Sequence, residues 1–324
     1  MSTLNTEPGL YRDSFEKDSC GVGFIANIKG RKSHQTVSDG LVMLERMAHR
    51  GACGCEANTG DGAGILIQVP HEFFVSECAK LGIKLPRYGE YGVGLVFFPA
   101  DKTVREECRT VLNRQIKKMR MTLLGYRELP TNHSDLGETA LKAEPRMEQV
   151  FIARPAAISD PDEFERKLYI LRKYTTRIIL ESVTGVNRQF YLSSLSYKTI
   201  SYKGMLTSGQ LRYYFADLQN EEVVSAFAVI HSRFSTNTSP SWRLAQPFRY
   251  LAHNGEINTV QGNINWLRSK EAFFSSEYFT REELDMILPV CNADGSDSSN
   301  LDAAVELLLH SGRSLPHVMM MLIP

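Results

Sequence analysis

The sequence lacks an excess of charge of either sign. Its 324 residues include 37 lysines and arginines and 37 aspartates and glutamates. Proteins that bind nucleic acid or an anionic membrane surface usually carry a basic excess. We therefore expect no nucleic-acid and no membrane partner, and no apolar run approaches the roughly 20 residues that span a bilayer.

The sequence also lacks the usual targeting segments at its start. Residues 1–19 contain Glu7, Asp13, Glu16 and Asp18. A secretory signal needs an apolar core, and organelle transit peptides are poor in acidic residues. We interpret this segment as a short polar leader and expect a cytoplasmic protein.

Cysteine is too sparse for a disulfide scaffold. We expect the six cysteines to be reduced, as is usual in the cytosol. Cys53 and Cys55 could bind a metal, but no second Cys or His pair is spaced to complete four ligands, so no metal site is expected. The six lie at positions 20, 53, 55, 78, 108 and 291.

Hydrophobic patterning predicts strands and helices in a mixed order. This order favours an α+β layered domain over a regular βαβ array, and the chain stops directly after an apolar run, as if a longer protein continued there. The predicted strands are 22–28, 65–70, 91–98, 123–129, 189–192, 199–202, 225–234 and 248–253; the predicted helices are 37–47, 71–81, 103–119, 161–181, one beginning near 256, 300–310 and 315–321; residues 131–145 are predicted to form a loop.

Cys20 follows the leader directly and precedes the first predicted strand. A cysteine at a strand edge is more often an inert apolar residue than a nucleophile. Removal of the leader would place its own α-amine, with a usual pKa of roughly 7.7–8.0, beside a thiol with a usual pKa of about 8.5. The amine could then take the proton as the thiol attacks, which is the N-terminal form of nucleophilic catalysis.

Arg233 and Asp297 lie in two later clusters, HSRFSTNT at 231–238 and DGSDSSNLD at 294–302. Arginine binds a carboxylate through a planar fork, and aspartate can hold an ammonium group. Together they suit a free α-amino acid, although each alone is more often a surface ion-pair member worth little energy.

Asn254 and Gly255 lie in HNGEIN at 253–258. An Asn-Gly pair most often forms a tight turn. The functional alternative is an oxyanion hole, in which a side-chain amide and a backbone N–H point at a developing negative charge. The glycine-rich loop at 60–64 is weak support for phosphate binding, because it lacks Lys-Ser/Thr and precedes a strand.

Taken in order, CGVGF, HRGACGCEANTGDGAGI, HSRFSTNT, HNGEINT and SDSSNLD resemble the motifs of class II (N-terminal nucleophile) glutamine amidotransferases, specifically the glutaminase domain of glutamate synthase. The resemblance runs from about Gly9 to Pro324. It implies the four-layer αββα sandwich of the N-terminal nucleophile (Ntn) hydrolases. It also implies a propeptide at 1–19 and an amidotransferase domain at 20–324 that is incomplete at its C-terminal end.

The resemblance implies a role in hydrolysing L-glutamine for each matching position. The implied nucleophile is Cys20, the oxyanion hole is Asn254 and Gly255, the carboxylate ligand is Arg233, the amino-group ligand is Asp297, and the turn beside the substrate contains Thr236 and Asn237.

Relatives of this kind pass ammonia through a tunnel to a synthase domain. There it combines with 2-oxoglutarate, and the imine is reduced on FMN with electrons relayed by an iron–sulfur cluster from NAD(P)H or ferredoxin. A TIM barrel alone needs ~250 residues, so we expect no cofactor on this chain. Two alternatives remain: a non-catalytic truncated fragment, or an Ntn acylase or class II amidotransferase that feeds a different acceptor.

Overall fold

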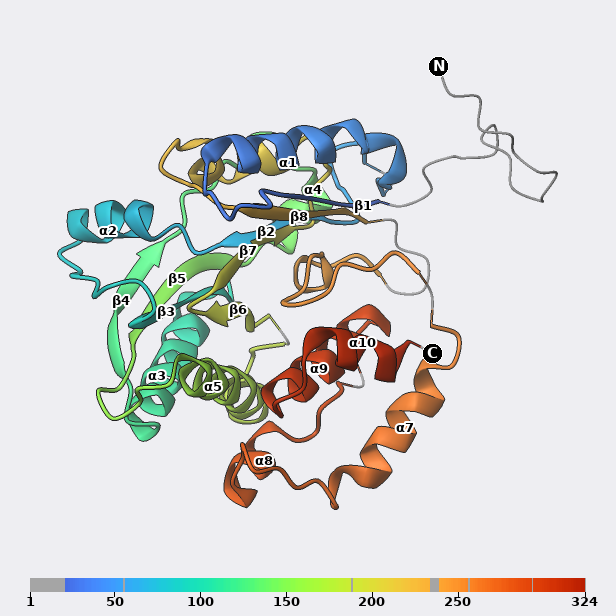
Figure 1. The fold of residues 1–324 in the computed structure, drawn as a ribbon. Coiled ribbons are helices and arrows are strands. Elements are labelled where there is room, and N and C mark those ends of the chain that lie inside the picture. Colours follow the sequence, from blue (N-terminus) through green and yellow to red (C-terminus); the bar gives the residue numbers. More distant parts are fainter. Residues whose placement is uncertain are drawn as a thin grey trace, which may run out of the picture.

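A computed structural model describes residues 21–54, 56–187, 189–233, 239–255, 257–292 and 294–323. Within them, two four-stranded antiparallel sheets pack face to face, and helices cover both outer faces (Figure 1). This is the α+β, four-layer αββα arrangement that the resemblance implies.

The first sheet has the strand order β1-β8-β2-β7, and all of its neighbours are antiparallel. Its strands are β1 (Val22–Ala26), β8 (Phe227–Ser232), β2 (Ala63–Gln68) and β7 (Thr199–Gly204). Helix α1 (His34–Arg46) covers its outer face, and the Ser33 hydroxyl caps that helix by accepting the backbone N–H of Thr36.

The second sheet has the strand order β4-β5-β3-β6. Its strands are β4 (Thr122–Glu128), β5 (Arg146–Ala153), β3 (Tyr91–Phe98) and β6 (Tyr191–Ser196). Helices α3 (Lys102–Lys118) and α5 (Pro161–Ser182) lie on its outer face (Figure 1). Proline at the first position of α5 costs no hydrogen bond, because that N–H has no partner inside a helix.

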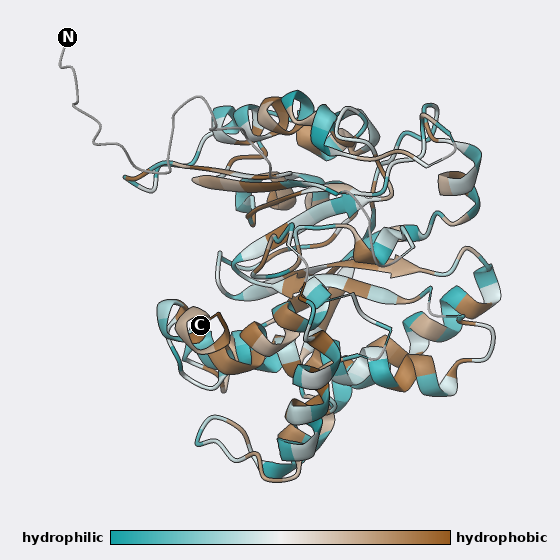
Figure 2. Ribbon diagram, turned by 90° about the vertical axis from the view of Figure 1, so that its right-hand side faces the viewer, coloured by the Kyte–Doolittle hydropathy of each residue, from teal (hydrophilic) through white to brown (hydrophobic). Residues whose placement is uncertain are grey.

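The core lies between the layers, where burial of apolar side chains stabilises the fold. Val93 and Leu95 of β3 and Ile65 and Ile67 of β2 are fully buried in the main cluster, which also includes Val37 and Leu41 of α1. A second cluster packs β3 and β5 against α3 and α5, and a third joins α5 to the C-terminal helices. Figure 2 shows hydrophobic residues concentrated on the strands inside the sandwich.

The C-terminal region adds helices beside α5 (Figure 1). They are α7 (Val260–Glu271), α8 (Arg281–Ile287), α9 (Asp297–His310) and α10 (Leu315–Leu322). The other short elements are α2 (His71–Lys80), α4 (Glu138–Lys142), α6 (Leu211–Tyr214) and 3-10 turns at Ala48–Arg50, Ala216–Gln219 and Trp242–Leu244. No helix among the described residues is both long and apolar enough to cross a membrane.

Most of the predicted elements are confirmed within a few residues, but two predictions are wrong and two elements were missed. The predicted strand at 248–253 is a loop, and the predicted loop at 131–145 contains α4. Strand β5 and helix α8 were not predicted. The helix expected near residue 256 begins at Val260.

Candidate functional site

The edge of the first sheet where β1 begins and β8 ends gathers several of the predicted site residues. Val22 pairs with His231 across the two strands. The Ser232 N–H donates to the Gly21 carbonyl at 2.6 Å, so this pairing continues one residue further. Arg233 follows directly at the end of β8. Cys20 precedes Gly21 and, like Thr236 and Asn237, lies outside the described residues.

Gly21 permits a close approach of two chain segments. A Cβ at this position would lie 2.1 Å from the Ser232 carbonyl oxygen, which no side chain tolerates. The same Cβ would lie 3.5 Å from Nδ2 of Asn254. The side-chain amide of Asn254 therefore lies over the backbone of the residue that follows Cys20.

The segment carrying Asn254 and Gly255 is a loop held by Gln246. The Gln246 amide accepts the His253 N–H at 2.9 Å and donates to the His253 carbonyl at 3.0 Å. Asn254 and Gly255 come next and are exposed. The reciprocal pair of hydrogen bonds thus fixes the residue before Asn254 and leaves the Asn-Gly pair facing solvent.

His231 supports the same loop from within the sheet. Its Nε2 lies 3.3 Å from the His253 carbonyl, and because a carbonyl only accepts, Nε2 carries the proton. Burial lowers the pKa of His231 to about 4, with the His253 carbonyl opposing that shift. The ring is therefore neutral at pH 7, and the Asn254 side chain also interacts with it.

Arg233 is buried against the glycine-rich loop. Its N–H donates to the Gly62 carbonyl at 2.8 Å, and its carbonyl accepts the Ala52 N–H at 3.2 Å. Gly62 has a φ of +146°, a conformation that favours glycine. The loop at 51–62 therefore holds the backbone of Arg233 from both sides, which is the structural role of the HRGACGCEANTGDGAG motif.

Two carboxylates lie close enough to Arg233 to affect the pKa of its guanidinium group. Burial lowers the pKa of Arg233, which remains 7% exposed, while Asp61 and Asp297 oppose that shift. Charged arginine is costly to bury without such compensation. The structure thus brings Arg233 and Asp297 into one electrostatic environment, although they are 64 positions apart in the sequence.

Asp297 begins α9 and joins that helix to the Asn254 loop. Its carboxylate accepts the Ile257 N–H at 3.0 Å and the Ser298 N–H at 2.6 Å. Ser298 also contacts the loop, since its Oγ lies 3.0 Å from Nδ1 of His253. The start of α9 and the segment at 253–257 therefore form one hydrogen-bonded unit.

The arrangement combines a guanidinium, a carboxylate and an exposed amide around the sheet edge where β1 begins. A guanidinium and a carboxylate can bind the two charged groups of an α-amino acid, and an amide N–H can stabilise an oxyanion. Among the described residues, no group of three or more His, Cys, Asp or Glu side chains could hold a metal ion.

Sequence reasoning missed three residues at this edge: His231, Gln246 and Asp61. The sequence offered a signal for two of them. His231 begins the polar His-Ser pair that ends the apolar strand AFAVIHS, and Asp61 lies between two glycines. Gln246 carries no sequence signal, because its role depends on a loop seven residues away closing back on it.

Comparisons with known proteins assign the sequence of this chain to a family. The family described as glutamine amidotransferases class-II matches residues 20–324. The large chain of glutamate synthase [NADPH] from Bacillus subtilis (strain 168) is 48% identical over 327 residues, covering 99% of this chain and 21% of that relative.

Two further relatives come from a fungus and a plant. Glutamate synthase [NADH] from Schizosaccharomyces pombe is 45% identical over 97% of this chain and 15% of the relative. Ferredoxin-dependent glutamate synthase 2, chloroplastic, from Arabidopsis thaliana is 44% identical over 95% of this chain and 19% of the relative. The chain therefore spans about a fifth or less of the length of these relatives.

Proposed function

Because the chain belongs to the class II glutamine amidotransferases, we propose that it hydrolyses L-glutamine to glutamate and ammonia at the edge of the first sheet. The observation that carries the proposal is the position of Asn254, whose amide nitrogen lies over Gly21, the residue after Cys20. Acyl transfer requires the oxyanion donor to lie beside the nucleophile.

The substrate would bind through its charged ends. Arg233 would bind the α-carboxylate, and Asp297 would bind the α-ammonium group. The two residues act on each other electrostatically, which supports a site for both charges of one amino acid. Thr236 and Asn237 would lie beside the bound substrate, as in the family.

The reaction would run through a covalent thioester. The α-amine of Cys20 takes the thiol proton as sulfur attacks the side-chain amide carbon of glutamine. Asn254 and the N–H of Gly255 stabilise the oxyanion. The tetrahedral intermediate collapses with loss of ammonia, which leaves with the transferred proton. Water then attacks the γ-glutamyl thioester, releasing glutamate and restoring the thiol.

This mechanism requires a free amine on Cys20. We infer that residues 1–19 form a propeptide that is removed, and that residues 20–324 form the amidotransferase domain. Residues 1–19 resemble neither a secretory signal nor a transit peptide, which supports a cytoplasmic location.

The ammonia would serve a synthase domain in a full-length protein. There it would combine with 2-oxoglutarate, with FMN, an iron–sulfur cluster and NAD(P)H or ferredoxin supplying the reduction. The names of the relatives support this destination, and the cofactors would belong to that domain.

The test combines N-terminal mass analysis with an ammonia-release assay on the purified chain. We expect Cys20 as the first residue and release of ammonia from glutamine. Cys20→Ala should abolish both processing and activity, whereas Cys53→Ser, at an exposed cysteine, should retain both. Glutamine hydrolysis by a chain that still carries Met1 would refute the free-amine mechanism.

The alternatives give different results in the same assay. A chain that hydrolyses simple acyl amides as well as glutamine would be an acylase, because such substrates make no use of Arg233 and Asp297. A chain with no cooperative thermal transition and no activity would be a non-catalytic fragment.

A further inference from the structure

A cavity of about 410 Å³ lies between α5, β6 and the segment from Met286 to Ala303. Its lining contains none of Gly21, Arg233, Asn254 and Asp297, so it is distinct from the candidate glutamine site. Cavities of this size hold small organic ligands.

Basic side chains dominate the polar part of the lining. The carboxylates that line the cavity are Glu181 and Asp294. The cations come from α5, α7, the 3-10 turn at Trp242–Leu244 and the loop after it, and they are Arg172, Lys173, Arg177, Arg243, Arg249 and Arg268.

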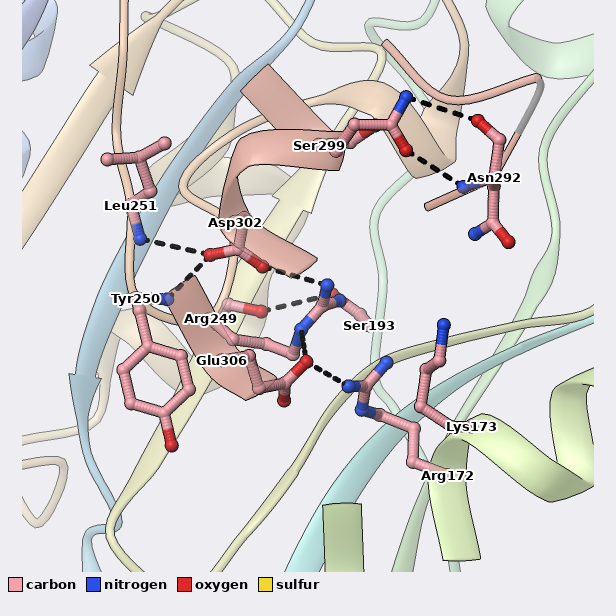
Figure 3. A network of polar contacts seen from close by, with 12 residues as sticks. Arg172, Lys173, Ser193, Arg249, Tyr250, Leu251, Asn292, Ser299, Asp302 and Glu306 are labelled. Carbon is pink, nitrogen blue, oxygen red and sulfur yellow. Dashed lines mark hydrogen bonds and ion pairs between the residues drawn. The ribbon is translucent and has the colours of Figure 1, made fainter. Parts of the chain in front are cut away.

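Two of these cations are neutralised by carboxylates outside the lining. Arg249 pairs with Asp302 at 2.8 Å and with Glu306 at 3.1 Å. Arg172 pairs with Glu306 from the other side. Figure 3 shows the two arginines meeting at Glu306, with Arg249 also paired with Asp302. This pair of arginines therefore adds little net charge to the cavity.

Lys173 and Arg177, unlike Arg172 and Arg249, donate hydrogen bonds to uncharged acceptors. Lys173 donates to the carbonyls of Pro289 at 3.0 Å and Val290 at 2.9 Å. Arg177 donates in the same way to the carbonyl of Asp285 at 3.0 Å, and to that of Leu288. A carbonyl accepts a hydrogen bond but cancels no charge.

Four cations then face two carboxylates. They are Lys173, Arg177, Arg243 and Arg268 against Glu181 and Asp294. Glu271 also acts on the lining residue Cys291 from outside the cavity, which leaves an excess of one positive charge. Burial lowers the pKa of Lys173 to about 8, and Arg172 adds to that shift. The field in the cavity is therefore positive.

The remaining walls are apolar. Phe190, Leu192, Leu244 and Phe248 contribute hydrocarbon surface. Glu181 and Arg268 are exposed and lie at the solvent-accessible side. A ligand that suits both kinds of wall carries negative charge on an apolar body.

We propose that this cavity binds a small organic dianion, with the charged group against Lys173, Arg177 and Arg268 and the apolar body against Phe190 and Phe248. The ligand would bridge α5 to the segment at 285–295, which precedes Asp297. This inference is independent of glutamine hydrolysis, because binding can be measured without turnover.

Titration calorimetry of the full chain tests the proposal with phenyl phosphate, a dianion on an aromatic ring at pH 7.5. We expect saturable one-site binding that is at least tenfold tighter than that of inorganic phosphate, because phosphate lacks the apolar body. Benzyl alcohol, which has the ring without the charge, should bind at least tenfold more weakly than phenyl phosphate.

Two variants and one matched control locate the site. Arg177→Gln and Arg268→Gln should each weaken phenyl phosphate binding at least tenfold. Arg268 is exposed, so its variant keeps the test valid even if Arg177→Gln unfolds. Lys270→Gln, on the same helix but outside the lining, should bind normally. Three results would overturn the proposal: absence of saturable binding, equal binding of phenyl phosphate and benzyl alcohol or phosphate, or unchanged binding in Arg268→Gln.

Discussion

Two arginines, the buried Arg233 at the sheet edge and the largely buried Arg249 paired with α9, lie in opposite electrostatic environments. Burial lowers the pKa of Arg233, and Asp61 and Asp297 offset that only in part. Burial also acts on Arg249, but Glu306 and Asp302 outweigh it and raise its pKa above the ordinary value. The network around Arg249 is thus compensated within the protein (Figure 3).

The difference separates a structural charge from one suited to a ligand. A guanidinium with carboxylates at 2.8 Å and 3.1 Å has little to gain from another anion. A guanidinium whose pKa is lowered by burial gains from any added carboxylate, because the added charge offsets its desolvation. We therefore expect Arg249 to affect stability and Arg233 to affect substrate binding.

The largest effect is expected for Glu306→Ala. This change leaves Arg172 and Arg249 buried with one carboxylate fewer, and breaking a buried pair costs about 3–5 kcal/mol. Urea unfolding should show this loss in the free energy of unfolding. Glu277→Ala, at an exposed position, is the control. A Glu306→Ala chain as stable as the parent would contradict the claim that the network around Arg249 stabilises the fold.

A somewhat smaller effect, on catalysis, is expected for Arg233→Lys. Lysine keeps the charge but loses the planar fork, so we expect kcat/KM for glutamine to fall about 100-fold, equivalent to about 2.7 kcal/mol. The free energy of unfolding should change by less than about 1 kcal/mol. Steady-state kinetics and urea unfolding of one preparation give both values. An unchanged KM would contradict the assignment of Arg233 to the substrate.

Asp302→Asn should destabilise the fold by about 1–3 kcal/mol. The Asp302 carboxylate accepts the N–H groups of Tyr250 and Leu251 at 2.9 and 3.1 Å. Asparagine can keep these bonds through its carbonyl but loses the charge opposite Arg249. Thermal unfolding measures the change. A loss of stability as large as that of Glu306→Ala would contradict the smaller contribution assigned to Asp302.

The last effect appears only at acid pH. Burial lowers the pKa of His310 to about 4, with Glu306 opposing. The pKa of His310 is about 6.5 in the unfolded chain and about 4 in the folded one. Between these two pH values the unfolded chain binds more protons than the folded chain. His310 therefore contributes to the free energy of unfolding above pH 6.5, and this contribution is lost as the pH falls towards 4.

His310→Gln should therefore flatten the acid side of the stability curve by at most about 1.4 kcal/mol per pH unit. Glu165, with a pKa raised to about 7 by burial, acts with the opposite sign and is present in both proteins. Urea midpoints at pH 4.5, 5.5 and 7 for parent and variant isolate the histidine. Parallel curves would contradict the assigned shift.

Local patterns predicted the elements whose stability comes from an apolar face. Strand β3 was predicted over its full range, because every residue from Tyr91 to Phe98 is apolar or glycine and all are buried. Helix α5 was predicted from Asp160-Pro161 and its periodicity, and the Asp160 carboxylate does cap it.

The wrong predictions fall where tertiary contacts replace local ones. Strand β5 carries two buried polar residues that have distant partners: Glu148 pairs with Arg109, and Gln149 accepts a hydrogen bond from Arg127 at 2.8 Å. The segment at 248–253 has the apolar character of a strand, but Asp302 takes two of its N–H groups and no ladder forms.

The same limit applies to the site. Motif resemblance pointed to Arg233, Asn254 and Asp297, and the structure places them around one sheet edge. The motif resemblance did not point to Gln246 or to the hydrogen bond between Asp297 and Ile257. Such contacts depend on how loops that are apart in the sequence pack against each other. The roles of these residues in catalysis remain predictions.

The most direct test of the central claim is intact mass analysis of the chain, acid-quenched during turnover of glutamine. The account predicts a chain beginning at Cys20 and carrying one added glutamyl group, which peptide mapping places on Cys20 and which Cys20→Ala lacks. Turnover with the glutamyl group on another residue, or with Met1 still present, would contradict it.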